Sequence, residues 1–224
     1  AARGGGDVDG RDLSHLVLGP GCGDNAGAAL GLGLRAGQTS VSLGTSGVVA
    51  AVSATPAHDA SGLVTGFADA TGAFLPLACT LNASRIIDAM ARVTGLDYGE
   101  FDEAALSVPD AGGLELVPFF EGERTPNLPD ATAELRGMTL ANSDRAHVAR
   151  AAVEGLLGLM RYALDAVRSL GVPLDRVVLV GGGAKSAAVR ALAPQMLDAA
   201  VELPEPGEYV ALGAAKQAAR VLGA

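Results

Sequence analysis

One carboxylate follows a glycine turn near the start of the chain, where an apolar run gives way to a helix of small residues. Residues 21–26 read GCGDNA, and Asp24 opens the helix. An aspartate at this place most often caps the helix by accepting hydrogen bonds from its first backbone N–H groups. The helix dipole also keeps such a carboxylate ionised, and an ionised Asp24 beside glycines that allow close approach can take a proton from a hydroxyl group. Both roles, helix cap and general base, fit the sequence.

A second glycine turn lies at residues 44–47, which read GTSG, between two short alternating apolar runs. Its length and residue types are typical of a β-hairpin. The turn offers backbone N–H groups and the hydroxyls of Thr45 and Ser46 without an acidic side chain, which suits a phosphate oxygen. Glycine, serine and threonine also form ordinary turns, so the motif alone has a purely structural explanation as well.

A third glycine turn ends the apolar run RVVLV and opens another helix, in the sequence GGGAKS at residues 181–186. Such a junction offers backbone N–H groups and a helix N-terminus to a phosphate or a ribose. It is not a Walker A loop, because Ala184 stands where that loop requires glycine, and it is not a regular dinucleotide fingerprint, because Ser186 replaces the third glycine. Glu202 lies where a ribose-binding acid would sit, yet the chain is too short for a second βαβ half. An NAD-dependent oxidoreductase therefore stays as an alternative.

The composition indicates a folded globular protein and argues against a nucleic-acid partner. Of 224 residues, 49% are hydrophobic and 18% are charged, which is enough apolar material for one good core or two small ones. The net charge is −9, tryptophan is absent and aromatic residues make up 4%, so neither base stacking nor a basic groove is expected. Because no signal peptide or membrane segment is recognisable, we expect a soluble, cytoplasmic protein.

Cysteine and histidine are too few and too scattered to indicate a disulfide framework or a metal cluster. Cys22 and Cys79 are expected to be reduced and buried as small apolar residues. His15, His58 and His147 have no metal-ligand spacing, which assigns them structural or surface roles.

Apolar periodicity and turn residues predict alternating strands and helices, and hence an α/β protein with a mixed sheet. The long helix carries one apolar stripe and has Asn142 or Ser143 available as its cap. Strands are expected at 15–19, 39–43, 48–53, 63–69, 74–81, 114–120, 176–180 and 200–203. Helices are expected at 24–36, 82–95, 98–107, about 143–170, 186–199 and 207–222.

Taken together, the three turns in this order and spacing resemble the C-terminal domain of the FGGY family of carbohydrate kinases, over nearly all of residues 16–223. Residues 118–140, which contain GERTP, look like the family's signature region, and GEYVALGAA at 207–215 resembles its closing helix. The resemblance implies an actin/hexokinase-like (ribonuclease H-like) ATPase domain, with a mixed sheet flanked by helices. Asn25 and GERTP look most like the members that phosphorylate D-xylulose, since glycerol kinases usually carry glutamine at the position of Asn25.

The resemblance also implies roles for individual residues. Asp24 would be the general base that deprotonates the sugar hydroxyl and would be the protein's contact to Mg²⁺, while Asn25 would contact the sugar. Lys185 is left outside the site as a solvated side chain, and Glu123 with Arg124 would either form an ion pair that braces the loop or contact a ligand. The residues implied for ATP binding are Gly44, Thr45 and Gly47 at the terminal phosphates, Gly182, Gly183 and Ala184 at the α-phosphate and adenosine, and Asn82 at the nucleotide wall.

Family members have two domains, and this sequence resembles only the second. Residues 1–14 are interpreted as a flexible lead-in or an interdomain remnant, and 15–224 as the nucleotide-binding domain, without the N-terminal domain that supplies most sugar contacts. The implied activity is ATP-dependent phosphorylation of a sugar, D-xylulose to D-xylulose 5-phosphate, with this chain inactive by itself. The alternative is a non-catalytic half-domain that binds nucleotide or protein and closes its apolar face by forming a homodimer.

Overall fold

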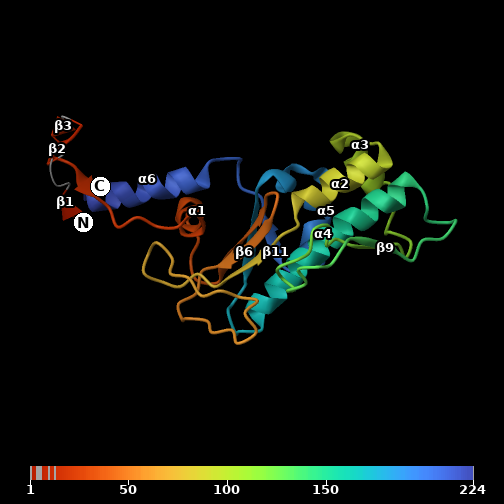
Figure 1. The fold of residues 1–224 in the computed structure, drawn as a ribbon, viewed down its shortest axis with the longest axis horizontal. Helices are drawn as coiled ribbons and strands as arrows, with labels where there is room; N and C mark the ends of the chain where they lie inside the picture. The colour runs from red at the N-terminus through yellow and green to blue at the C-terminus, as the bar shows by residue number, and fades with distance from the viewer. Residues whose placement is uncertain (1, 4–6, 10, 13, 224) are drawn as a thin grey trace.

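A five-stranded sheet forms the centre of the protein (Figure 1), and it is mixed, as the sequence predicts. The computed structural model describes residues 2–223 except 4–6, 10 and 13. β11, β10 and β5 run parallel, whereas β5, β6 and β7 form an antiparallel meander. In spatial order the strands are β11 (Ala200–Glu202), β10 (Arg176–Val180), β5 (Gln38–Leu43), β6 (Gly47–Ala51) and β7 (Leu77–Thr80).

Four helices cover one face of the sheet and bury the main core, at the right in Figure 1. The longest, α4, is amphipathic, and its apolar stripe, including Leu157 and Met160, is fully buried. α5 contains Pro194 near its C-terminal end. The helices are α2 (Ser84–Thr94), α3 (Tyr98–Leu106), α4 (Arg145–Arg168) and α5 (Ala187–Leu197), and the 3₁₀-helix η1 (Gly182–Lys185) precedes α5.

The opposite face is covered by α1 (Asp24–Leu32), on which α6 (Tyr209–Val221) packs. The two helices approach closely because glycines face each other. A Cβ at Gly31 would collide with the Tyr209 carbonyl, and one at Gly213 would collide with the Gly27 backbone. Lys216 Nζ donates hydrogen bonds to the carbonyls of residues 30 and 31 at the C-terminal end of α1. α1 ends four residues before the predicted boundary because Gly33 adopts the left-handed conformation.

In the part of the chain that the structure describes, three short ladders lie outside the main sheet. The predicted buried strand at 15–19 is wrong: only Val17–Leu18 form a strand, they are exposed, and they pair with residues 2–3. The predicted strand at 63–69 is reduced to isolated bridges, and β7 begins only after Pro76, which has no N–H for the ladder. The ladders are β1 (Ala2–Arg3) with β4 (Val17–Leu18), β2 (Asp7–Val8) with β3 (Arg11–Asp12), and β8 (Glu115–Val117) with β9 (Glu134–Arg136).

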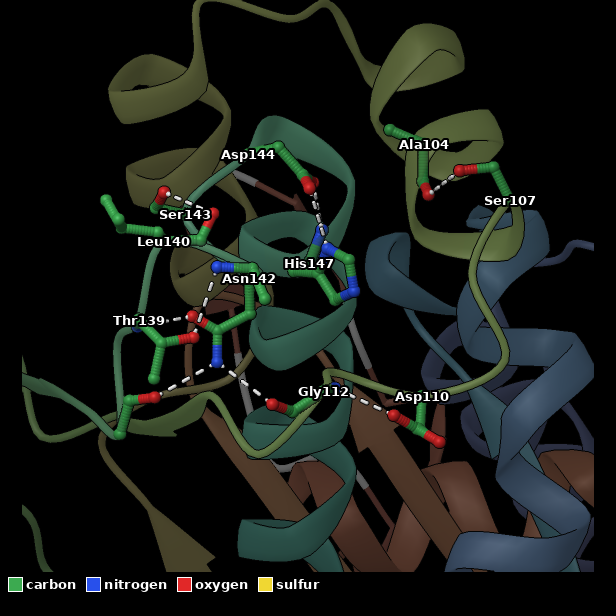
Figure 2. Close-up of polar contacts among 12 residues, drawn as sticks. Ala104, Ser107, Asp110, Gly112, Thr139, Leu140, Asn142, Ser143, Asp144 and His147 are labelled. Atoms are coloured by element: carbon green, nitrogen blue, oxygen red, sulfur yellow. Dashed lines mark hydrogen bonds and ion pairs between the residues drawn. The ribbon is translucent and has the colours of Figure 1, made fainter.

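The cap of α4 differs from the prediction, as Figure 2 shows. Asp144, rather than Asn142 or Ser143, accepts a hydrogen bond from the His147 backbone N–H (3.0 Å), and its other oxygen lies 2.8 Å from the imidazole Nδ1. Asn142 is buried and ties together the loops that precede the helix. Its side chain bonds the carbonyls of Gly112 and Gly137 and the N–H of Thr139.

Two further expectations concern exposure. Cys22 is exposed, contrary to the prediction, and Cys79 is half-buried. Cys22 belongs to the turn before α1 rather than to a strand of the sheet, so nothing in the main core covers it. Among the helices that the structure describes, none is long and apolar enough to cross a lipid bilayer.

Candidate active site

The sheet topology brings the second and third glycine turns to one end of the sheet. β5 and β10 are parallel and end side by side, with Ser42 in register with Val180. β6 begins at the same end, where Gly47 pairs with Thr80 of β7. We call this the site end of the sheet: residues 43–47, 80–82 and 180–183.

The hairpin tip at the site end is held with its carbonyl groups turned toward α2. The Gly44 carbonyl accepts a hydrogen bond from Ser84 N–H (2.9 Å), and the Thr45 carbonyl accepts one from Ala83 N–H (3.1 Å). These bonds satisfy N–H groups at the start of α2 that have no partner within the helix. The backbone N–H groups of Thr45 and Ser46 make no hydrogen bond to any residue in the described part of the chain, and both residues are exposed. The tip therefore presents free donors to an anion.

Gly47 has a packing role at the base of the hairpin. Its N–H donates to Thr80 Oγ1 (3.1 Å), so it has no donor left for a ligand. A Cβ at this position would lie 2.5 Å from the Met160 methyl carbon, because the long helix passes directly beneath the turn. Of the residues predicted at the terminal phosphates, Thr45 is open to solvent, Gly44 is half-buried and Gly47 is buried.

The third turn lies against the end of β5. A Cβ at Gly181 or at Gly183 would come within 3 Å of Leu43, whereas one at Gly182 would meet nothing within 4 Å. Gly182 is exposed, and Ala184 is 7% exposed with its N–H bonded to the Gly181 carbonyl. Of the predicted residues in this turn, Gly182 is therefore the one that a ligand can approach freely.

The N-terminus of α5 is occupied by a carboxylate of the protein itself. Asp102, on α3, accepts hydrogen bonds from Ser186 Oγ (2.5 Å) and from the backbone N–H groups of Ala187 (2.7 Å) and Ala188 (3.4 Å). This helix start is thus unavailable to a phosphate, which differs from the sequence expectation. Instead, Asp102 fixes the glycine turn against α3. The sequence alone gave no signal for this contact, since the two segments are far apart along the chain.

A cavity of about 420 Å³ opens beside the third turn, between α2, α3 and η1. Ile87 supplies an apolar wall, and the Tyr98 hydroxyl donates to Asp88 Oδ1 (2.8 Å), which fixes the ring and raises the pKa of Tyr98. This volume lies in the range of small-ligand pockets. Its lining comprises Ser84, Ile87, Asp88, Tyr98, Gly99, Asp102, Gly182, Gly183, Lys185 and Ser186. Sequence reasoning missed Tyr98, because a tyrosine at a helix start carries no sign of a pocket.

Asp24 is the first residue of α1 and does not cap it. Gly23 occupies the cap position without any side-chain bond, and among the described residues Asp24 Oδ1 accepts a hydrogen bond only from the adjacent Asn25 N–H (2.8 Å). The cap interpretation is therefore wrong, and the exposed carboxylate has free lone pairs. Burial raises the pKa of the Cys79 thiol on β7, which the charge of Arg124 lowers and that of Asp24 raises.

Asn82 is not brought to the surface. The residue is 0% exposed, and its Nδ2 donates to the Gly122 carbonyl and to Glu123 Oε2, at 2.9 Å in each case. Its Oδ1 has no partner among the described residues. Because Asn82 is fully buried, a nucleotide could reach Oδ1 only if the residues that cover it moved, so the geometry favours a structural role.

Glu123 is a buried anchor that holds the signature region to the end of β7. It is 1% exposed and accepts hydrogen bonds from the backbone N–H groups of Leu81 (2.6 Å), Asn82 (3.3 Å) and Arg124 (2.7 Å). The sequence left open whether Glu123 braces the loop or contacts a ligand. It braces the loop, but through backbone N–H groups rather than through an ion pair with Arg124.

The mixed α/β fold and the two glycine turns at one end of its sheet define a candidate phosphate-binding domain, and comparison with known proteins identifies its family. Residues 39–222 match the family model for the FGGY family of carbohydrate kinases, C-terminal domain. The chain therefore belongs to this family, and the predicted family and fold class are confirmed.

Individual relatives agree with this assignment. The chain is 44% identical over 209 residues to the xylulose kinase of Streptomyces coelicolor, covering 92% of this chain and 41% of that protein. The crystal structure of xylulose kinase from Bifidobacterium adolescentis is 56% identical and superimposes with a TM-score of 0.86, over 92% of this chain and 41% of that one. Plasmodium falciparum glycerol kinase with ADP shares the fold, with a TM-score of 0.80 at 20% identity over 89% of this chain and 41% of that one. The chain thus spans about two fifths of the length of these relatives.

Proposed function

We propose that this chain supplies the nucleotide-binding half and the general base of an ATP-dependent sugar kinase that converts D-xylulose to D-xylulose 5-phosphate. The observation that carries the proposal is the hairpin tip. Its Gly44 and Thr45 carbonyl groups accept hydrogen bonds from the start of α2, and the N–H groups of Thr45 and Ser46 have no partner among the described residues. The tip shares the site end of the sheet with an open glycine turn. The names of the relatives, which are xylulose kinases at 44% and 56% identity, support the choice of sugar.

The residues present fit ATP. The cavity of about 420 Å³ beside Gly182 has the size and the mixed apolar and polar lining that an adenosine needs. Gly182 allows the backbone to approach the α-phosphate, and the free N–H groups of Thr45 and Ser46 suit the terminal phosphates. In this arrangement Gly44, Gly47 and Gly183 shape the turns, and Asn82 supports them from within.

Magnesium also fits this site. Mg²⁺ is commonly held by one or two carboxylates together with substrate phosphates and water. Asp24 is an exposed carboxylate of this kind, and the described residues form no group of three or more potential ligands that would hold a metal without the nucleotide. When bound, Mg²⁺ would neutralise charge on the phosphates.

The protein needs to supply little covalent chemistry, since phosphoryl transfer depends mainly on positioning and electrostatics. Asp24 accepts the proton of the sugar hydroxyl, and Asn25, half-buried beside it, orients the sugar. The N–H groups of Thr45 and Ser46 stabilise the charge on the phosphate oxygens. Remaining sugar contacts would come from the part of such kinases that this chain does not match, so we expect the chain alone to be inactive.

The test is an assay of the whole protein for sugar-dependent ADP formation, with D-xylulose, glycerol and D-gluconate compared at equal concentration. We expect ADP formation with D-xylulose well above that with the other two acceptors. If ATP binds but no sugar is phosphorylated, the alternative of a non-catalytic nucleotide-binding domain is correct and the proposal fails.

The NAD alternative has no support at Glu202, which is ion-paired with Arg176 at 2.8 Å.

A further inference from the structure

Arg124 is a cation without an assigned partner, and it follows Glu123, which is hydrogen-bonded to Leu81 at the site end of the sheet. It is exposed, and its guanidinium forms no ion pair with any carboxylate in the described ranges. Some described arginines are paired with carboxylates, for example Arg85, whereas others, such as Arg92, form no ion pair either. What distinguishes Arg124 is its place next to Glu123, which is hydrogen-bonded to Leu81 at the site end. A free guanidinium beside a phosphate-binding turn has an evident chemical use, because its planar fork of N–H donors matches phosphoryl oxygens.

The backbone of Arg124 is fixed by its neighbour. Glu123 is fully buried and accepts hydrogen bonds from the N–H groups of Arg124 and Leu81, at 2.7 and 2.6 Å. The Leu81 carbonyl in turn accepts a hydrogen bond from Ser46 Oγ (3.3 Å) at the hairpin tip. Arg124 is therefore connected to the proposed phosphate-binding tip through only two intervening residues.

The Arg124 side chain itself is not needed for this brace. The Glu123 carboxylate receives its hydrogen bonds from backbone N–H groups and from the Asn82 amide, and none comes from the guanidinium. The side chain is thus free while its backbone is held, which is the arrangement of a ligand-binding residue on a rigid support.

We infer that Arg124 is a catalytic residue that contacts the transferring phosphoryl group at the hairpin tip, beside the N–H groups of Thr45 and Ser46. This inference rests on the proposed kinase function. In the step concerned, the sugar oxygen forms a bond to the γ-phosphorus, the bond from that phosphorus to the bridging oxygen of ADP breaks, and the hydroxyl proton passes to Asp24. Arg124 donates hydrogen bonds to the phosphoryl oxygens as this exchange proceeds. Removing one such donor typically lowers turnover by about 10²–10³-fold.

The experiment compares Arg124→Ala and Arg124→Lys in the whole protein by steady-state kinetics and thermal unfolding. For Arg124→Ala we expect kcat to fall about 10²–10³-fold, with KM values changed much less and an unchanged melting temperature. Arg124→Lys should retain part of the activity, since it keeps the charge but loses the planar fork. Guanidinium ion at non-denaturing concentration should restore turnover to Arg124→Ala but not to Asp24→Asn. Arg136→Gln, which breaks a surface pair on β9, is the matched control and should leave kcat unchanged.

Three results would overturn the inference: wild-type kcat in Arg124→Ala, a loss of activity that follows a lower melting temperature, or equal loss in both variants without any response to guanidinium. Failure of the proposed function is distinguishable, because the wild-type protein would then form no ADP with D-xylulose. An active wild type with an equally active Arg124→Ala would retain the kinase proposal and remove only Arg124.

Discussion

The two faces of the central sheet differ in how much apolar surface they bury. The face under α2, α3, α4 and α5 holds the main core, in which Leu157 and Met160 are 0% exposed. The opposite face is covered by α1 and a small core of mostly short side chains, and α6 rests on α1 with Gly213 as its one buried residue. α6 also leaves Val210 and Leu212 about half exposed, at 47% and 45%.

This difference separates stability from chemistry. We call the face under α2, α3, α4 and α5 the thick side and the face under α1 the thin side. The turns proposed to bind nucleotide rest on the thick side, where Met160 lies under Gly47 and Leu43 lies under Gly183. The proposed general base, Asp24, stands on the thin side at the start of α1, and its carboxylate makes no cap or ion pair with the described residues. A change at a buried position on the thick side should therefore affect folding first, and a change at Asp24 should affect turnover alone.

The largest effect is expected for Asp24→Asn. Loss of a general base typically lowers turnover by about 10²–10⁴-fold, while the melting temperature should not change because the side chain does not cap α1. Steady-state kinetics and thermal unfolding of the whole protein check both parts. Asp130→Asn, which makes the same chemical change at an exposed loop position, is the control and should keep wild-type turnover. Unaltered turnover in Asp24→Asn would remove Asp24 from the mechanism.

A core deletion on the thick side should have the next largest effect. Leu157→Ala on α4 opens a cavity at a fully buried position and should lower the free energy of unfolding by about 2–5 kcal/mol. Leu212→Ala, at a half-exposed position on α6, should change it by less than about 0.5 kcal/mol. Urea denaturation of the chain measures both. Equal losses in the two variants would contradict the difference between the faces.

Two glycines at the site end should respond differently to the same substitution. Gly47→Ala pushes a Cβ against Met160 and Thr80 and should cost about 1–3 kcal/mol in the free energy of unfolding. Gly182→Ala places its Cβ in open space, so stability should be retained while affinity for Mg-ADP falls. Urea denaturation gives the free energy of unfolding of both variants, and calorimetry gives their affinity for Mg-ADP. A Gly182→Ala variant that is as destabilised as Gly47→Ala would contradict the expected difference.

The smallest effect is expected for Asp165 on α4, whose contribution to the free energy of unfolding depends on pH. Burial raises the pKa of this carboxyl, but hydrogen bonds from Arg168 and Arg161 outweigh it, so the pKa is lowered on folding. A lowered pKa adds stability above the unfolded value near about 3.9, and this contribution is lost as pH falls through the folded value. Because the side chain is about half exposed, Asp165→Asn should cost less than about 1 kcal/mol at pH 7. The difference from wild type should vanish in strong acid, as urea denaturation at several pH values would reveal.

The sequence was sufficient for features that depend on local pattern. The apolar stripe of α4 and the hairpin at residues 44–47 follow from spacing and turn chemistry, and both are present. Val17–Leu18 failed as a core strand because an apolar run does not reveal which partner it pairs with. Asp144 was missed as a cap because three polar residues compete for that position, and only one can have the required backbone conformation.

The candidate site was predictable only in outline. Asp24, Thr45 and Gly182 could be selected from the sequence because glycine turns and helix starts can be recognised along the chain. All three are exposed in the structure. The burial of Asn82 and the bonds of Asp102 to α5 depend on contacts between distant segments, for which one sequence carries no signal. Tertiary packing therefore decides which polar residues near a motif are free to bind a ligand.

The most direct test of the central claim, that the site end of the sheet binds a nucleotide, is a calorimetric titration of this chain with Mg-ADP, with NAD as the control. We predict selective binding of ADP with a Kd of about 0.1–1 mM, as expected for half of a two-part site, and weaker binding in Gly182→Ala. Binding of NAD in preference to ADP, or equal affinity of wild type and Gly182→Ala for ADP, would contradict the account.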